Sequence, residues 1–308
     1  MNFTHKNHIR YTINNRLYGY RETPQEKYKV SVGEIDKDHY KNSTYQQELL
    51  RTADLIYKDY GKDFALFLSG GTDSEIVLRN FLDIGIKPQC YTIKFKDDYN
   101  ISDVQEAIDL STELNIPLNI IDFDVKEFLY SGEASEFGKE LQCTQITYLM
   151  VYHSILKTGL PAVMGGELLL KRNINTDPST WHYCLRENED GSAIRFSFKY
   201  NIPLVNEYFS YTPELMLYYL EDPDIQTLVS TKYNYKLTSV SSKNVILKKL
   251  VPEIRVRKKT HGFEKLLGFN FEAYRQLASE QILRLEPSLD GIEYNKIIQQ
   301  LRGNDGNS

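Results

Sequence analysis

Residues 64–74 of this chain read FALFLSGGTDS, and this stretch decides the fold. Its first five residues are apolar, which predicts a short strand buried on both faces of a sheet. A Ser-Gly-Gly turn follows, and then apolar residues at Ile76, Val77, Phe81 and Ile84 recur at the spacing of a helix face. The turn is therefore expected to connect the carboxyl end of a strand to the amino end of a helix.

The turn at Ser69, Gly70 and Gly71 has the features of an anion-binding loop. The first N–H groups of a helix have no partner within it, and the helix dipole favours negative charge beside them. Two glycines let the backbone approach an anion without a Cβ in the way. A Walker loop is excluded because Gly-Lys-Ser/Thr is missing and the nearest lysine, Lys62, precedes the strand. The alternative is an ordinary glycine turn capped by Asp73.

The composition narrows the class of protein. A chain of 308 residues with 41% hydrophobic residues predicts one large or two modest domains with a substantial core. A net charge of −5 gives no general attraction to nucleic acid or to an anionic membrane. The three cysteines, Cys90, Cys143 and Cys184, lack metal-ligand spacing, which favours a reducing compartment. With no signal-peptide pattern and no apolar run of about 20 residues, we expect a cytoplasmic protein without a membrane span.

The segments around the loop predict an α/β fold. Helices are expected at residues 43–60, 102–114, 124–143, 144–157 and 206–220, and further strands at 89–95, 118–123 and 160–164. Ser102 is expected to cap its helix. Residues 1–40 contain short alternating stretches that indicate a small antiparallel hairpin or meander. The β-α-β-α-β series predicts a parallel, doubly wound sheet.

Ligands of such sheets bind beyond the carboxyl ends of the strands. That edge is expected to carry the Ser69 loop, Asp122 and the backbone near Ile93, where adenine would lie. Gly165-Gly166-Glu167 follows the strand at 160–164 and repeats the design of two glycines at a strand end. The alternative for this second turn is a simple capped turn.

Two later stretches are open to more than one interpretation. Residues 171–197 are polar and favour either a lid over the site or a surface excursion. Six cations lie between Lys248 and Lys259, and Gly262 and Phe263 follow them. A charge run is usually a solvated face, but in an acidic chain this one also suits a cluster that faces phosphate.

Residues 69–74 resemble the pyrophosphate-binding loop of N-type ATP pyrophosphatases, the PP-loop superfamily, whose pattern is Ser-Gly-Gly-x-Asp-Ser. Within that superfamily the chain resembles the synthetase domain of asparagine synthetase. Gly165-Gly166-Glu167 is similar to that family's Ser-Gly-Glu, with Gly in place of Ser. Residues 245–263 are similar to its Leu-Arg, Leu-Pro and Arg-x-Lys-x-x-Phe segment, with one extra residue before Phe263.

The resemblance implies a doubly wound, mostly parallel five-stranded sheet of the adenine nucleotide alpha hydrolase-like type. It also implies an AMP-forming amide ligase that uses ATP and Mg²⁺, adenylates a carboxylate and transfers the acyl group to an amine or ammonia. Asp73 would hold Mg²⁺, Glu167 would accept the amine's proton, and Lys259 with Arg257 would contact the α phosphate. The nucleotide would be bound by Ser69, Gly70, Gly71, Thr72, Asp73, Ser74, Ile93, Gly165 and Gly166.

The chain departs from that family in two places. The family's N-terminal glutaminase needs a cysteine at position 2, where this chain has Asn2, and about 40 residues are too few for such a domain. Ammonia, an amine substrate or a separate glutaminase would then supply the amine. Leu168 to Lys171 replace the family's acidic run, which leaves the second metal ligand and the acceptor open.

We expect three parts: a β element at 1–42, an ATP-binding synthetase domain at 43–275 and a helical tail at 276–308 with a disordered end. The first part would cover the substrate pocket or form a homodimer contact. One alternative function is adenylation of a nucleobase or nucleoside in tRNA or DNA modification. Another is a non-catalytic binding module, against which the complete loop at 69–74 argues.

Overall fold

The fold is built on a five-stranded sheet. The computed structural model describes residues 8–13, 16–17, 29–141, 143, 145–166, 170–173, 177–183, 191–230, 239–240, 262 and 292–303. The sheet has the strand order β10-β7-β4-β5-β6, and each of its pairings is parallel. Its strands are β4 (Ala65–Phe67), β5 (Gln89–Phe95), β6 (Leu118–Phe123), β7 (Ala162–Val163) and β10 (Leu204–Val205). The predicted doubly wound α/β fold is therefore confirmed.

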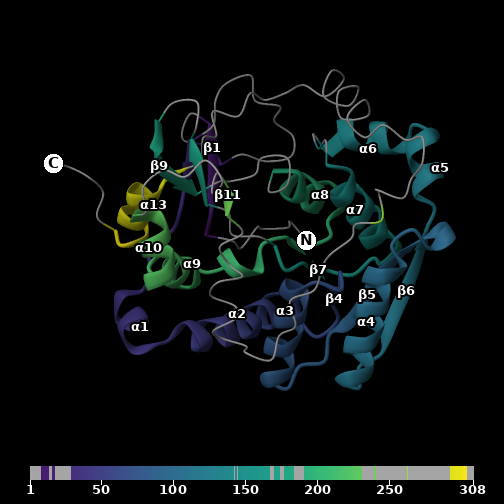
Figure 1. Cartoon of the computed structure of the whole chain (residues 1–308), viewed down its shortest axis with the longest axis horizontal. Coiled ribbons are helices and arrows are strands. Elements are labelled where there is room, and N and C mark those ends of the chain that lie inside the picture. Colours follow the sequence, from purple (N-terminus) through teal and green to yellow (C-terminus); the bar gives the residue numbers. More distant parts are fainter. Residues whose placement is uncertain are drawn as a thin grey trace.

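Helices cover both faces of this sheet. Figure 1 shows α2 (Tyr45–Tyr60), α3 (Thr72–Asp83) and α4 (Ile101–Glu113) below the sheet, and α6 (Glu133–Leu141), α7 (Ile146–Thr158) and α8 (Ser192–Tyr200) above it. The remaining helical elements are α1 (Lys37–Asn42), η1 (Lys96–Asp98), α5 (Val125–Tyr130), η3 (Tyr208–Ser210), α9 (Pro213–Leu220), α10 (Pro223–Ser230) and α13 (Tyr294–Leu301). None of the helices in the described ranges combines the length and the apolar character needed to cross a bilayer.

Strand β4 belongs to both hydrophobic cores. Its side chains alternate between the two faces of the sheet. Leu66 lies in the core between the sheet and helices α2, α3 and α4, and Ala65 and Phe67 lie in the core between the sheet and helices α6, α7 and α8. All three side chains are buried. A strand buried on both faces needs apolar residues at every position, so the uninterrupted run at residues 64–68 is what makes β4 the centre of the sheet.

The order of the strands creates a switch point beside β4. From β4 the chain continues to β5 and β6 on one side, and later to β7 and β10 on the other. The connections after β4 and β7 therefore leave the sheet in opposite directions, and ligands of doubly wound sheets commonly bind beyond the carboxyl ends of such strands. The predicted loop at 69–74 follows β4, and the second glycine turn follows β7.

The turn between β5 and α4 differs from the sequence prediction. Asn100, not Ser102, is the N-cap residue of α4, so the predicted cap was wrong. Asn100 Oδ1 accepts a hydrogen bond from Phe95 N at 2.8 Å, and Asn100 Nδ2 donates to Ile93 O at 2.8 Å. The side chain of Asn100 therefore closes the turn back onto β5, and the helix begins one residue before Ser102.

The amino-terminal segment forms a small antiparallel sheet in the order β2 (Arg16–Leu17), β1 (Arg10–Ile13) and β3 (Lys29–Ser31). This confirms the predicted N-terminal β element. His8 Nε2 lies 3.0 Å from the carbonyl oxygen of Ser210, and Ile9 is buried in the core under α2. The segment is thus fixed to the strand-end region that follows β10.

A second sheet occupies part of the stretch expected to be a lid or surface excursion. Strands β8 (Leu170–Asn173) and β9 (Asp177–Tyr183) form an antiparallel pair, flanked by β11 (Ser239–Val240) and β12 (Ile292–Glu293). Helix α13 follows β12, and its Ile297 and Leu301 are buried in the core between the sheet and helices α2, α3 and α4. The outer partners come from far along the chain, so a local pattern could not reveal this sheet.

Candidate functional site

The loop after β4 is held in shape by Ser74. Ser69 N donates a hydrogen bond to Ser74 Oγ at 3.2 Å, and Ser74 Oγ donates to Gly71 O at 3.0 Å. The hydroxyl oxygens of Ser69 and Ser74 lie 3.4 Å apart. The Ser74 side chain is buried at the start of α3. Its hydroxyl therefore ties the loop to the first turn of the helix.

Gly70 brings this loop against α4. Its φ of +68° lies in the left-handed region, and a Cβ at this position would stand 2.3 Å from the carbonyl oxygen of Asp103 in the first turn of α4. No side chain fits at that distance from a backbone atom. Position 70 thus requires glycine both for its backbone angle and for its contact with α4.

The loop leads into the amino end of α3. Its N-cap residue is Gly71, and no side chain caps this helix end. Thr72, Asp73 and Ser74 form the first turn, where the N–H groups have no acceptor within the helix. The helix dipole adds a partial positive charge at this point. A helix end of this kind commonly binds an anion such as a phosphate group, and anion binding here stays a prediction.

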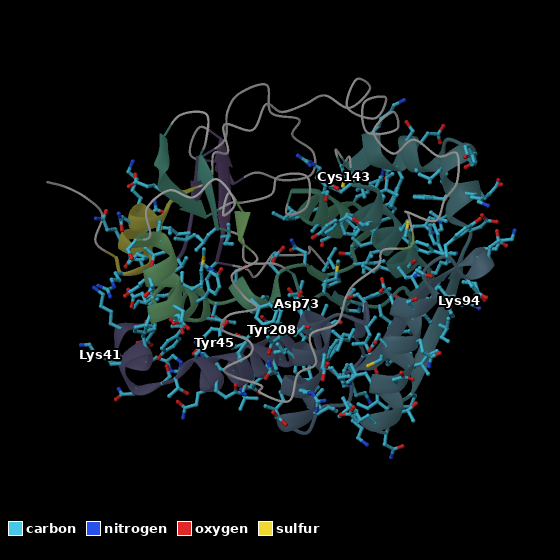
Figure 2. All side chains as sticks on the ribbon, viewed as in Figure 1. Lys41, Tyr45, Asp73, Lys94, Cys143 and Tyr208 are labelled. Atoms are coloured by element: carbon cyan, nitrogen blue, oxygen red, sulfur yellow. The ribbon has the colours of Figure 1, made fainter. Side chains whose placement is uncertain are left out.

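The second glycine turn meets the first. Gly165 follows β7, and a Cβ there would lie 3.0 Å from Asp73 Cβ and 3.3 Å from Ser74 N. The structure therefore brings together the two glycine turns that lie far apart in the sequence, as expected for the ends of adjacent parallel strands. Figure 2 shows Asp73 near the middle of the molecule.

Gly166 makes a different contact, with the end of β10. It has a φ of +71°, and a Cβ there would lie 2.2 Å from Glu207 Oε2 and 2.7 Å from Asn206 O. Glu207 is 7% exposed, and its neighbour Tyr208 donates its N–H to Gly165 O at 3.2 Å. Sequence reasoning missed Glu207 because residues 206–220 were interpreted as one helix. The signal that was present is an apolar run, Leu204-Val205, followed at once by Asn206 and Glu207.

Ile93 lies in β5, paired in register with Ile121 of β6. Its carbonyl oxygen accepts the hydrogen bond from Asn100, and its side chain packs against the core above the sheet. Adenine binding by the backbone at Ile93 stays a prediction.

One described residue of the basic carboxyl-terminal stretch reaches the same edge of the sheet. Gly262 has a φ of +79°, and a Cβ there would lie 2.8 Å from Asn100 Cβ and 2.9 Å from the carbonyl carbon of Tyr99. The contact is with the turn that follows β5. Gly262, which belongs to the segment 245–263 that resembles asparagine synthetase, therefore lies at the carboxyl edge of the sheet.

Glu167, Arg257 and Lys259 lie outside the described residues. Their roles at the site stay predictions from the resemblance.

The rim beyond β5 and β6 carries ion pairs. Lys94 Nζ lies 2.8 Å from Asp98 Oδ1, and Lys96 Nζ lies 2.7 Å from Asp124 Oδ2. The hydrogen bond from Lys94 to Asp98 raises the pKa of Lys94. Figure 2 shows Lys94 at the β6 side of the molecule. Asp122, which pairs in register with Lys94, also lies on this rim.

The residues present fit Mg²⁺ bound jointly with phosphates. Within the described ranges, no group of three or more His, Cys, Asp or Glu side chains gathers to hold a metal ion. Mg²⁺ commonly takes one or two carboxylates together with phosphate oxygens and water. Asp73, in the first turn of α3 and close to Gly165, would supply one such carboxylate beside the N–H groups of that turn.

Comparisons with known proteins give distant structural likenesses. No family model matches the chain, and no curated protein matches its sequence. The structure of NMN synthetase from Francisella tularensis is 12% identical with a TM-score of 0.32, and the match covers 81% of this chain and 99% of that one. A predicted subunit of tRNA methyltransferase from Methanocaldococcus jannaschii DSM is 16% identical with a TM-score of 0.30, covering 62% of this chain and 87% of that one. TM-scores this low do not establish a common fold, so the case for a nucleotide site rests on the chain's own loops.

Proposed function

We propose that this chain is a PP-loop enzyme that binds ATP with Mg²⁺ and cleaves it between the α and β phosphates. We further propose that it is an AMP-forming carbon-nitrogen ligase of the asparagine synthetase type. The observation that carries it is the contact of Gly165 with Asp73 and the Ser74 N–H group. This contact supports the proposal because it brings the turns after β4 and β7 together at the switch point of the sheet.

The first step activates a carboxylate. An oxygen of the substrate carboxylate attacks the α phosphorus, the bond to the bridging oxygen breaks, and pyrophosphate leaves with the electron pair. The N–H groups at the amino end of α3 stabilise the charge on the leaving pyrophosphate. When bound, Mg²⁺ would neutralise further phosphate charge, held by Asp73. Lys259, supported by Arg257, is proposed to face the α phosphate.

The second step forms the amide. The nitrogen of an amine or ammonia attacks the carbonyl carbon of the acyl-adenylate, the carbon–oxygen bond to AMP breaks, and AMP leaves. The nitrogen must lose a proton, and Glu167 is proposed to accept it. The nitrogen is proposed to come from free ammonia, from an amine substrate or from a separate glutaminase.

The test is exchange of radiolabelled pyrophosphate into ATP, measured with the twenty protein amino acids and simple dicarboxylates as acceptors. The proposal predicts exchange that depends on one of these carboxylates and is lost in Asp73→Asn. The matched control is Asp83→Asn, the same change at the exposed far end of the same helix. Asp83→Asn should exchange at the wild-type rate. Exchange that survives Asp73→Asn would overturn the placement of the site.

The same assay separates the alternative function. Unmodified tRNA replaces the carboxylates in a second arm, with a series of salt concentrations. Exchange that requires RNA and weakens as salt rises would show that a nucleobase, not a carboxylate, is the group that is adenylated. Exchange that requires a small carboxylate and ignores RNA would exclude that alternative.

A further inference from the structure

The start of α4 limits where the loop after β4 can lie. Helix α4 follows β5, and β5 is the neighbour of β4 in the sheet. A Cβ at Gly70 would stand 2.3 Å from Asp103 O and 3.1 Å from Glu106 Cβ, both in the first half of α4. The loop therefore rests against the first turns of this helix, and a shift of those turns would shift the loop.

Asn100 fixes the start of α4 to β5. The residue is 8% exposed, and its side chain accepts from Phe95 N and donates to Ile93 O, each at 2.8 Å. Its main-chain oxygen accepts from Asp103 N at 3.0 Å and from Val104 N at 3.1 Å. An asparagine at an N-cap usually turns its side chain to the first N–H groups of its own helix, whereas the side chain of Asn100 bonds to β5 instead. One residue thus ties the strand to the helix.

The carboxamide of Asn100 lies directly beyond the end of β4. Leu68 N, just after β4, donates to Tyr91 O of β5 at 2.7 Å. Main-chain groups point alternately to the two sides of a strand, so Ile93 O and Phe95 N point to the same side of β5 as Tyr91 O. Asn100 therefore takes the bonding positions on β5 that come next after the one used by Leu68. This is the place where the chain leaves the sheet and the loop after β4 begins.

These contacts form a chain that runs from β5 through Asn100 and Asp103 to Gly70. We propose that Asn100 is a positioning residue for the loop at 69–74: it holds the first turn of α4 against Gly70 and so keeps the amino end of α3 in the shape that binds pyrophosphate. The inference rests on the proposed function, and it adds a residue that acts on the phosphates only through the loop.

The test compares wild type with Asn100→Ser in two measurements. Serine is also a good N-cap residue, but its side chain is too short to make both bonds to β5. Hydrogen exchange, followed by mass spectrometry on the peptide that covers residues 69–74, should be about tenfold faster in the variant because the loop loses its support. The dissociation constant for magnesium pyrophosphate, measured by calorimetry, should rise about tenfold.

The control is Asn119→Ser. Asn119 Nδ2 also donates to a main-chain oxygen of β5, Cys90 O at 3.1 Å, but it does so from β6, on the side of β5 away from β4. This variant should leave loop exchange and pyrophosphate affinity within about twofold of wild type. If Asn100→Ser unfolds, the same comparison is made with Asn100→Asp, which keeps an acceptor for Phe95 N and lacks the donor to Ile93 O. It should again speed exchange in the loop and weaken pyrophosphate binding.

Three results in the Asn100 variant would overturn the inference: loop exchange at the wild-type rate, exchange accelerated equally in the loop and in α7, or unchanged affinity for magnesium pyrophosphate. The second result would mean that Asn100 supports the fold as a whole rather than the loop. Failure of the wild-type protein to bind magnesium pyrophosphate and ATP is a separate outcome, seen without any variant. It would overturn the proposed function, and this inference with it.

Discussion

Gly165 lies directly against Asp73: a Cβ at Gly165 would stand 3.0 Å from Asp73 Cβ and 3.2 Å from its carbonyl carbon. These residues lie far apart in the sequence, but they follow neighbouring parallel strands, β7 and β4. The contact brings the turns after β7 and β4 together. It also means that small changes at position 165 act on the helix end proposed to bind pyrophosphate.

Gly165→Ala should therefore weaken ATP binding. The added methyl group must displace the first turn of α3, and overpacking of this kind costs about 1–3 kcal/mol. We expect the dissociation constant for ATP, measured by calorimetry, to rise about tenfold, which corresponds to about 1.4 kcal/mol. Gly159→Ala is the control, because a Cβ there meets nothing within 4 Å. Unchanged ATP affinity in Gly165→Ala would show that this contact does not shape the binding site.

Gly70→Ala should be more damaging than Gly159→Ala. Both glycines have positive φ, +68° and +65°, so alanine is conformationally strained at each, by about 1–2 kcal/mol. Only at Gly70 does the new Cβ meet a backbone atom, Asp103 O at 2.3 Å, whereas nothing lies within 4 Å at Gly159. The free energy of unfolding, from urea titration, should fall clearly further in Gly70→Ala. Equal losses in the two variants would rule out the close approach of the loop to α4.

Ser74→Ala should loosen the loop. The substitution removes the hydroxyl that accepts from Ser69 N and donates to Gly71 O. Leaving these backbone groups without that partner costs about 1–3 kcal/mol. We expect a lower melting temperature and a reduced rate of pyrophosphate exchange. Ser74→Cys, which keeps a weak donor and acceptor, should lie between alanine and wild type in both measurements, and a variant as active as wild type would argue against this role of Ser74.

Cys90 should be unreactive in the folded protein. Burial in the core under α2 raises the pKa of the Cys90 thiol to about 12, so the reactive thiolate is scarce at pH 8. Mass spectrometry after iodoacetamide treatment should find Cys90 modified slowly in buffer and rapidly in urea. Comparable rates under both conditions would mean that this part of the core is open to solvent.

The protein should lose stability at low pH as the carboxylate of Asp124 becomes protonated. It caps α5 by accepting a hydrogen bond from Glu127 N at 3.0 Å, which lowers the pKa of Asp124, and Lys96 lowers it further. A carboxyl group whose pKa is depressed by folding stabilises the protein above its unfolded pKa and loses that effect as pH falls through the folded value. Asp124→Ala should therefore have a lower melting temperature than wild type at pH 7, and the gap should narrow below about pH 4. A gap that stays constant with pH would contradict the role of the carboxylate.

The central part of the fold could be predicted because its signals are local. The apolar run before Ser69 and the strands at 89–95 and 118–123 follow from short patterns, and the structure places the latter two at those residues. The glycine turns could be expected to meet because the carboxyl ends of adjacent parallel strands lie together. The sequence could not show which side of the turn each glycine faces.

The rest depended on contacts between distant segments. The pair β8 and β9 is completed by strands from residues 239–240 and 292–293, which no local window contains. Glu207 was hidden because β10 has two residues, too short to show a period of two, and a helical segment follows it. Ser102 was mistaken for a cap because the competing bonds of Asn100 to β5 arise only in the folded chain.

The most direct test of the central claim is to identify the products of ATP turnover by phosphorus NMR, in the presence of the acceptor and ammonium chloride. If the loop at 69–74 holds the two outer phosphates, wild-type protein will release AMP and pyrophosphate, and Asp73→Asn will release neither. Release of ADP and inorganic phosphate, or equal AMP formation by Asp73→Asn, would contradict the account.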